Sequence, residues 1–88
     1  MPTLSVFYGI IVYMYNEKGN KHNLPHIHAE YQNDEIVVDI DGNVLEGNLP
    51  KSKLKLLLAW MEIHRDDLYA NWKLLSSGKE YFRIDPLR

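Results

Sequence analysis

The sequence contains no cysteine, which excludes disulfide bonds and thiolate metal sites. A bound metal ion would need histidine, carboxylate or water ligands. Long hydrophobic runs are also missing, because the longest, Val6 to Met14, is about half of the ~20 residues that a membrane helix requires. The first residues lack the basic-then-apolar order of a secretion signal. We therefore expect no insertion in a membrane and a cytoplasmic location.

An excess of positive charge is missing as well. The chain has 10 Lys and Arg against 12 Asp and Glu, for a formal net charge of −2. This balance disfavours binding of nucleic acid through a large basic surface, although a local site that cleaves RNA remains compatible with it. The length of 88 residues suits a single domain, residues 1–88, with one small core.

Most of the first half of the chain is predicted to form β-structure. Segments rich in β-branched and aromatic residues alternate with polar or glycine-containing turns. They predict an antiparallel meander of three to four strands, at residues 4–15, 26–31, 36–40 and 44–46.

The second half is predicted to be helical. Apolar residues at helical spacing indicate a helix from about residue 50 to residue 77, either long or bent. A polar gap in this spacing predicts a bend or break near residues 64–67. Gly78 suits the end of the helix, and residues 79–84 can return as a short C-terminal strand. An α+β fold follows, with helix packed on one face of the sheet.

The predicted strand at 26–31 carries two closely spaced histidines. Because side chains alternate along a strand, His26, His28 and Glu30 share one face, while Ile27 and Ala29 share the other. The apolar pair predicts a core-facing side. The polar set is then expected to face solvent or a cleft, where it could hold a metal, transfer a proton or bind a polar ligand.

The turn at residues 32–35 predicts which residues pair across the next strand. If two or four residues form the loop, His28 lies opposite Asp39 and His26 lies opposite Asp41, while the other face pairs only apolar residues. A carboxylate at one imidazole nitrogen fixes the tautomer and leaves the other nitrogen for a proton or a metal. Ordinary polar pairing on a solvated strand is the alternative interpretation.

An enzymatic hypothesis follows from these pairs. His26 and His28 would act as general acid and base in RNA cleavage, and Asp39 and Asp41 would orient them. No cofactor is needed for this chemistry, but a cation must face the phosphate. The candidates are Lys21, His22 and the lysines at 51, 53 and 55.

A metal site is the second hypothesis. Two histidines in a His-x-His strand can bind zinc or a similar divalent metal, with further ligands needed for a stable site. The candidate ligands are His22, His26, His28 and Glu30. The helical zinc signatures are absent from the sequence.

A non-enzymatic interaction module is the third hypothesis. A sheet edge or an exposed aromatic stripe would bind a partner protein or a second copy of the chain. The stripe would consist of Trp60, Tyr69, Trp72 and Tyr81. His64 is expected to pack at the helix bend, and it could join the histidine site only if the helix covered the polar sheet face.

The chain also shows a set of motifs that run in order along nearly its whole length. They are Met1-Pro2-Thr3-Leu4, Phe7, Gly9-Ile10, Pro25-His26-Ile27-His28, Leu45-Glu46-Gly47-Asn48-Leu49-Pro50, Trp60, His64-Arg65-Asp66-Asp67-Leu68 and Asn71-Trp72. In these motifs the chain resembles the bacterial family catalogued as domain of unknown function 4160. Leu24 and Ile27 depart from the family pattern, which has a proline and often an aromatic residue at these places.

The resemblance implies a small protein of a two-gene cassette, in the manner of toxin–antitoxin modules. Its implied partner is a small protein encoded by the neighbouring gene. The polar residues that the resemblance singles out are His26, His28, Glu46 and His64, and it assigns no role to them.

Overall fold

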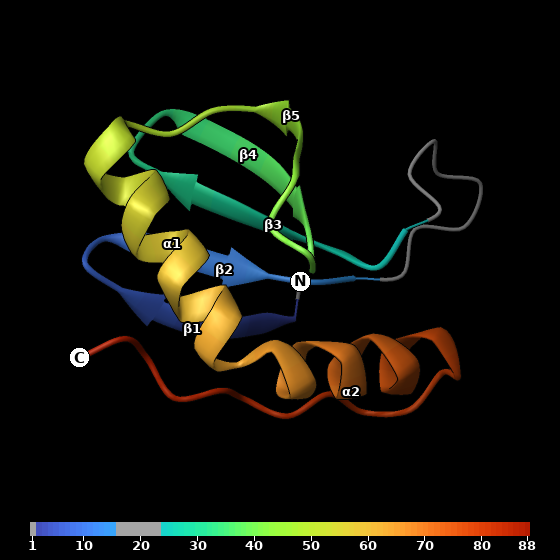
Figure 1. The fold of residues 1–88 in the computed structure, drawn as a ribbon. Coiled ribbons are helices and arrows are strands. Elements are labelled where there is room, and N and C mark those ends of the chain that lie inside the picture. Colours follow the sequence, from blue (N-terminus) through green and yellow to red (C-terminus); the bar gives the residue numbers. More distant parts are fainter. Residues whose placement is uncertain (1, 16–23) are drawn as a thin grey trace.

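The computed structural model describes residues 2–15 and 24–88. Within these ranges the chain forms one five-stranded antiparallel sheet in the order β1-β2-β3-β4-β5, followed by two helices (Figure 1). The elements are β1 (Thr3–Phe7), β2 (Ile10–Tyr13), β3 (His26–Tyr31), β4 (Asp34–Asp39), β5 (Val44–Gly47), α1 (Lys51–Ile63) and α2 (Arg65–Ser76). The predicted α+β class is confirmed, with one strand more than expected.

The additional strand comes from residues 4–15, which we expected to form a single strand. The chain instead reverses at Tyr8 and Gly9, and Phe7 then pairs with Ile10. Tyr8 and Gly9 both have positive φ angles, 50° and 79°, as a two-residue turn of type I′ requires. Apolar residues continue on both sides of this turn, so the sequence carries no polar interruption that would reveal it.

The register between β3 and β4 also differs from the prediction. The turn uses only Gln32 and Asn33, so that Tyr31 pairs with Asp34. Gln32 has a φ of 54°, in the left-handed region that few side chains favour. The pairing is therefore shifted by two residues from the expected one. The faces are unaffected, because strand side chains alternate with a period of two.

The predicted break in the helix is confirmed. His64 separates α1 from α2 with φ −108° and ψ 23°, which lies outside the helical region. Gly78 follows α2 with a φ of 74°, and the Lys79 backbone N–H donates to the Leu74 carbonyl oxygen at 2.8 Å. This six-residue closure is the usual end of a helix at a glycine. Neither helix in the described part of the chain is long and apolar enough to cross a membrane.

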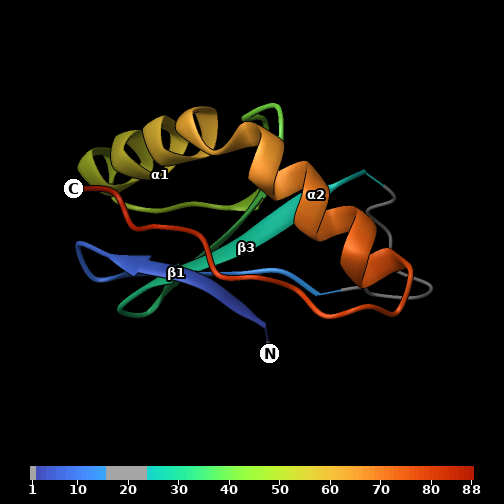
Figure 2. The ribbon, with the colours of Figure 1, turned by 90° about the horizontal axis from the view of Figure 1, so that it is seen from below.

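The residues after α2 do not form the short strand that we considered for 79–84. They run back beside the helices toward β1 (Figures 1 and 2). A single backbone hydrogen bond of 2.9 Å joins the Ile84 N–H to the carbonyl oxygen of Leu4. The buried side chain of Asn71 accepts from the Phe82 N–H and donates to the Phe82 carbonyl oxygen, at 2.8 and 3.0 Å. Side-chain hydrogen bonds therefore replace most of the ladder expected of a strand.

The core lies between the sheet and the helices, which cover the same face of the sheet (Figure 2). Leu57, Trp60 and Leu68 contribute from the helices, and Ile27 and Ile36 from the middle of the sheet. The Trp60 indole N–H donates to the Asp85 carbonyl oxygen at 2.8 Å, so its one polar group is satisfied. The helices leave most of the opposite face of the sheet open, apart from the start of β3, where Trp72 of α2 packs against His26. The open part of this face carries the candidate site.

Candidate binding site on the open sheet face

The histidine strand β3 has the two faces that its sequence predicts. Ile27 and Ala29 are fully buried in the core, while His26, His28 and Glu30 alternate with them on the opposite face. Burial nevertheless differs within the polar set, since His26 has no exposed surface and His28 is partly exposed. The two histidines therefore have different environments.

His26 is a packed side chain. Its Nδ1 lies 2.7 Å from the carbonyl oxygen of Leu24. A carbonyl oxygen only accepts, so Nδ1 must carry the proton in this arrangement. The ring also packs against Trp72 of α2 and against His28, with centroid distances of 5.1 and 5.2 Å. A buried ring in these contacts is poorly placed to meet a substrate.

The predicted histidine–aspartate pairs are wrong in their register. Asp39 lies opposite His26, and Val37 occupies the position opposite His28. Both carboxylate oxygens of Asp39 accept hydrogen bonds from Asn43, one from the backbone N–H at 2.8 Å and one from the side-chain amide at 3.1 Å. Asp39 therefore stabilises the turn between β4 and β5.

Asp41 is bound elsewhere. Its carboxylate pairs with the guanidinium of Arg65 and accepts a hydrogen bond of 3.4 Å from the Tyr69 hydroxyl. The hydrogen bond from Arg65 to Asp41 raises the pKa of the Arg65 side chain. The contacts connect the β4–β5 turn to the first turns of α2. The predicted pairing of Asp41 with His26 is thus replaced by a contact between turn and helix.

His28 lies instead beside two tyrosines. Its ring is nearly parallel to those of Tyr15 and Tyr13, at centroid distances of 4.6 and 5.6 Å. The two tyrosine rings lie 6.0 Å apart with an angle of 8° between their planes. Tyr13 is the direct cross-strand partner of His28, which explains how β2 brings these rings together. The sequence places Tyr13 and Tyr15 on one face of their strand, but the β2–β3 register was not predicted.

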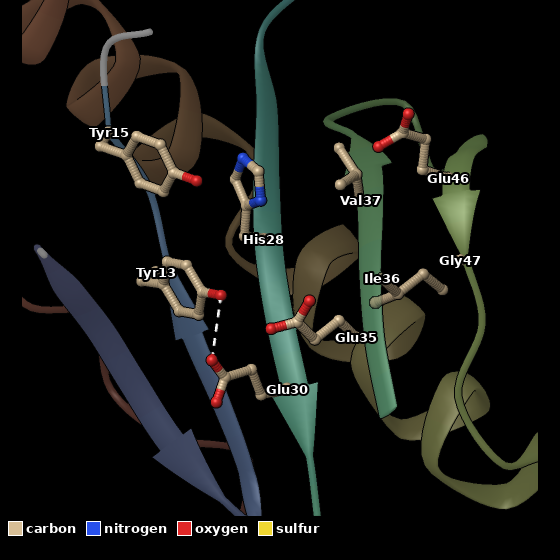
Figure 3. A pocket seen from close by; sticks show the side chains of 9 residues that line it. All are labelled: Tyr13, Tyr15, His28, Glu30, Glu35, Ile36, Val37, Glu46 and Gly47. Atoms are coloured by element: carbon tan, nitrogen blue, oxygen red, sulfur yellow. Dashed lines mark hydrogen bonds between the residues drawn. The ribbon is translucent and has the colours of Figure 1, made fainter. Parts of the chain in front are cut away.

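An open hollow of about 480 Å³ lies in front of these rings (Figure 3). Nine residues line it: Tyr13, Tyr15, His28, Glu30, Glu35, Ile36, Val37, Glu46 and Gly47. Three of them are glutamates, and no Lys or Arg of the described chain is among them. The hollow therefore combines aromatic surface with negative charge, a combination suited to cations.

Glu30 and Tyr13 are joined by a hydrogen bond inside this hollow. The Tyr13 hydroxyl donates to Oε1 of Glu30 at 3.1 Å (Figure 3). Burial of the phenol is the largest cause that raises the pKa of Tyr13 well above its usual range, and the hydrogen bond to the Glu30 carboxylate is the second. Tyr13 is consequently a neutral hydrogen-bond donor at physiological pH.

The raised pKa of Tyr13 predicts a loss of stability in alkali. The folded-state pKa exceeds the unfolded value of about 10, so the stabilisation is complete below pH ~10 and is lost as the pH rises further. The free energy of unfolding, measured in urea from about pH 8 to about pH 11, should fall more steeply for the wild type than for Tyr13→Phe. Equal slopes for the two proteins would contradict this assignment.

The other residues considered from the sequence are dispersed. His22 and Lys21 lie outside the described residues. Among those described, no three His, Asp or Glu side chains are placed to hold a metal ion. Lys53 donates to the Tyr8 carbonyl oxygen at 3.2 Å and its ammonium lies 4.9 Å from the Tyr31 ring centroid, in the β1–β2 turn region. It is thus engaged on α1, which lies on the other side of the sheet (Figure 2).

The helix residues do not form the expected exposed aromatic stripe. Trp60 is fully buried, so the stripe is interrupted at its first member. His64 packs against Trp60 with a centroid distance of 5.4 Å, and its Nδ1 lies 3.8 Å from Asp67. His64 therefore packs at the helix bend, as the sequence indicates. Of the residues that the resemblance singles out, the structure brings His28 and Glu46 to the hollow.

Fold and site together define a small α+β protein with an antiparallel sheet, helices on one face and an acidic, aromatic hollow on the other. The chain belongs to the family described as domain of unknown function (DUF4160), whose model matches residues 9–73. This match includes every residue that lines the hollow. No curated protein and no solved structure matches the chain.

Proposed function

We propose that the protein is a non-enzymatic interaction module, the antitoxin-like or regulatory member of a two-gene pair. Its open sheet face binds the basic surface of the protein encoded by the neighbouring gene. The observation that carries the proposal is the composition of this face. The helices lie mainly on the other side of the sheet, and the open side has an acidic, aromatic hollow beside exposed apolar side chains.

The apolar part of this face lies next to the hollow. Val6 and Ile11 are cross-strand partners on β1 and β2, and they are 48% and 38% exposed. Ile11 also pairs with Glu30 of β3, so apolar and acidic surface are contiguous. Protein interfaces combine an apolar, aromatic centre with a charged rim in this way. The glutamates favour a basic partner, and they disfavour a face-to-face dimer, which would bring like charges together.

The same geometry gives less support to RNA cleavage. Phosphate is repelled by a hollow lined by three glutamates. The general acid–base pair would also require His26, which is buried, with an Asp39 that already accepts two hydrogen bonds from Asn43. A binding role requires no such rearrangement.

A matched pair of substitutions tests the docking face. Ile11→Arg places a cation on the open face, whereas Ile63→Arg makes the same change at a 66% exposed position at the end of α1. We expect the wild type and Ile63→Arg to bind the neighbouring gene product equally in calorimetry. Ile11→Arg should bind at least about tenfold more weakly, a loss of roughly 1.4 kcal/mol.

Two results would overturn this function. The first is that the neighbouring gene product does not bind the wild type, or binds Ile11→Arg as tightly. The second is cleavage of RNA by the purified protein that is lost in a folded His28→Ala variant. Circular dichroism and thermal unfolding of each variant establish that it is folded.

A further inference from the structure

We propose that the hollow is a binding site for a guanidinium group, namely an arginine side chain of the partner protein. This inference rests on the proposed function and adds the chemical group that the site recognises. Its first support is a pair of like charges. Glu30 and Glu35 lie directly opposite each other on β3 and β4, on the side of the sheet that the helices leave open.

Such a pair is unfavourable without a cation. Directly opposite strand residues have Cβ atoms about 5 Å apart, and like charges at this distance destabilise the sheet. The Tyr13 hydroxyl holds Glu30 in place through its 3.1 Å hydrogen bond. Among the residues that the structure describes, none that lines the hollow is a lysine or arginine. A cation bound between Glu30 and Glu35 would turn this repulsion into attraction.

The aromatic rings supply the second, independent support. Tyr13, Tyr15 and His28 present nearly parallel rings at the hollow (Figure 3). A planar guanidinium stacks on such rings and donates two parallel hydrogen bonds to a carboxylate. A lysine ammonium is a compact, strongly hydrated charge that cannot make this planar contact. The geometry therefore favours arginine over lysine.

The size of the hollow agrees with a side chain. Its volume of about 480 Å³ falls in the range of sites for small organic groups, roughly 300–1,000 Å³. A metal ion would need a closer set of ligands, and no group of three His, Asp or Glu among the described residues offers one. A guanidinium with its aliphatic stem matches both the volume and the apolar surface that Val37 presents to the hollow.

The test uses the full chain and a small probe, Nα-acetyl-arginine methylamide, in an NMR titration. We expect saturable shifts at Tyr13, His28 and Glu35, with a dissociation constant in the millimolar range, as suits so small a ligand. The matching citrulline compound has nearly the same shape without the charge, and should bind at least about tenfold more weakly. The lysine compound should also bind more weakly than the arginine compound. Equal binding of the arginine and citrulline compounds, or no saturable shift at the hollow, would overturn the inference.

Two double variants with equal charge change serve as site and control. Glu30→Gln with Glu35→Gln should reduce arginine binding at least about tenfold. Glu62→Gln with Glu80→Gln, at exposed positions away from the hollow, should leave it unchanged. The first double variant loses a like-charge pair, so it should melt no lower than the wild type, and loss of folding would not explain weaker binding.

The two proposals fail in different ways. Suppose the neighbouring gene product binds the wild type and the Glu30→Gln, Glu35→Gln variant equally, and the arginine compound does not bind. Then the guanidinium site is refuted while the docking face stands. Saturable arginine binding at the hollow, without any binding of the neighbouring gene product, refutes the proposed partner and supports the site.

Discussion

Replacing Gly47 with alanine should destabilise the protein by roughly 3 kcal/mol or more. Gly47 has a φ of 72°, which alone costs a residue with a Cβ atom about 1–2 kcal/mol. An added Cβ would also overlap the carbonyl oxygen of Glu35 and lie 3.1 Å from its carbonyl carbon. These are backbone atoms of β4, so relief requires β5 to move away from its partner strand. The cost therefore exceeds that of the φ angle alone.

Gly78 provides a matched control. It has nearly the same φ, 74°, but no atom lies within 4 Å of an added Cβ. Gly78→Ala should therefore cost only the φ penalty of about 1–2 kcal/mol. Urea unfolding followed by tryptophan fluorescence measures both losses, against a total stability of roughly 4–13 kcal/mol for a chain of this length. Equal losses in the two variants would show that the contact with Glu35 can be relieved without cost.

Local periodicity accounts for most of the fold that the sequence predicted. Ile27 and Ala29 alternate with polar residues, and this alternation alone assigns the faces of β3 correctly. The break at His64 follows from the polar gap in the helical pattern. Both features depend on residues close in the sequence, where the periods of 2 and 3.6 are reliable signals.

Features set by turn geometry were predicted less well. Four polar residues, 32–35, could form the turn after β3, and the chain uses the first two, with Gln32 in an uncommon left-handed conformation. That choice shifts the register by two residues and separates His28 from its predicted partner Asp39. The turn at Tyr8 was missed because it interrupts a continuous apolar run.

The candidate site was only partly predictable for a related reason. His28 and Glu30 could be assigned to the open face from β3 alone. Tyr13 joins them through the pairing of β2 with β3, and Glu46 through the pairing of β5 with β4. The first of these pairings spans a long connection whose register the sequence does not determine. A site built from four strands therefore emerges only once the sheet is assembled.

The second large effect is expected at Asn71, in the attachment of the C-terminal segment. Asn71 is fully buried, and its amide oxygen and nitrogen bond the N–H and carbonyl oxygen of Phe82. Asn71→Asp keeps the shape of the side chain but replaces the donor to the Phe82 carbonyl with a carboxylate oxygen. At neutral pH this buries a charge against another oxygen, at a cost of about 3 kcal/mol.

The pH dependence of Asn71→Asp distinguishes this cause from a change in packing. Burial raises the pKa of the introduced carboxyl above its unfolded value of about 3.9. The protonated acid can again donate to the Phe82 carbonyl, so the variant should approach wild-type stability near pH 4. It should lose stability relative to the wild type as the pH rises through the raised pKa.

Asn71→Ala, which has no titrating group, should show a constant deficit. Urea unfolding of the three proteins from about pH 4 to about pH 8 measures these differences. A deficit for Asn71→Asp that does not change with pH would mean that the segment around Phe82 detaches and that the carboxylate becomes solvated.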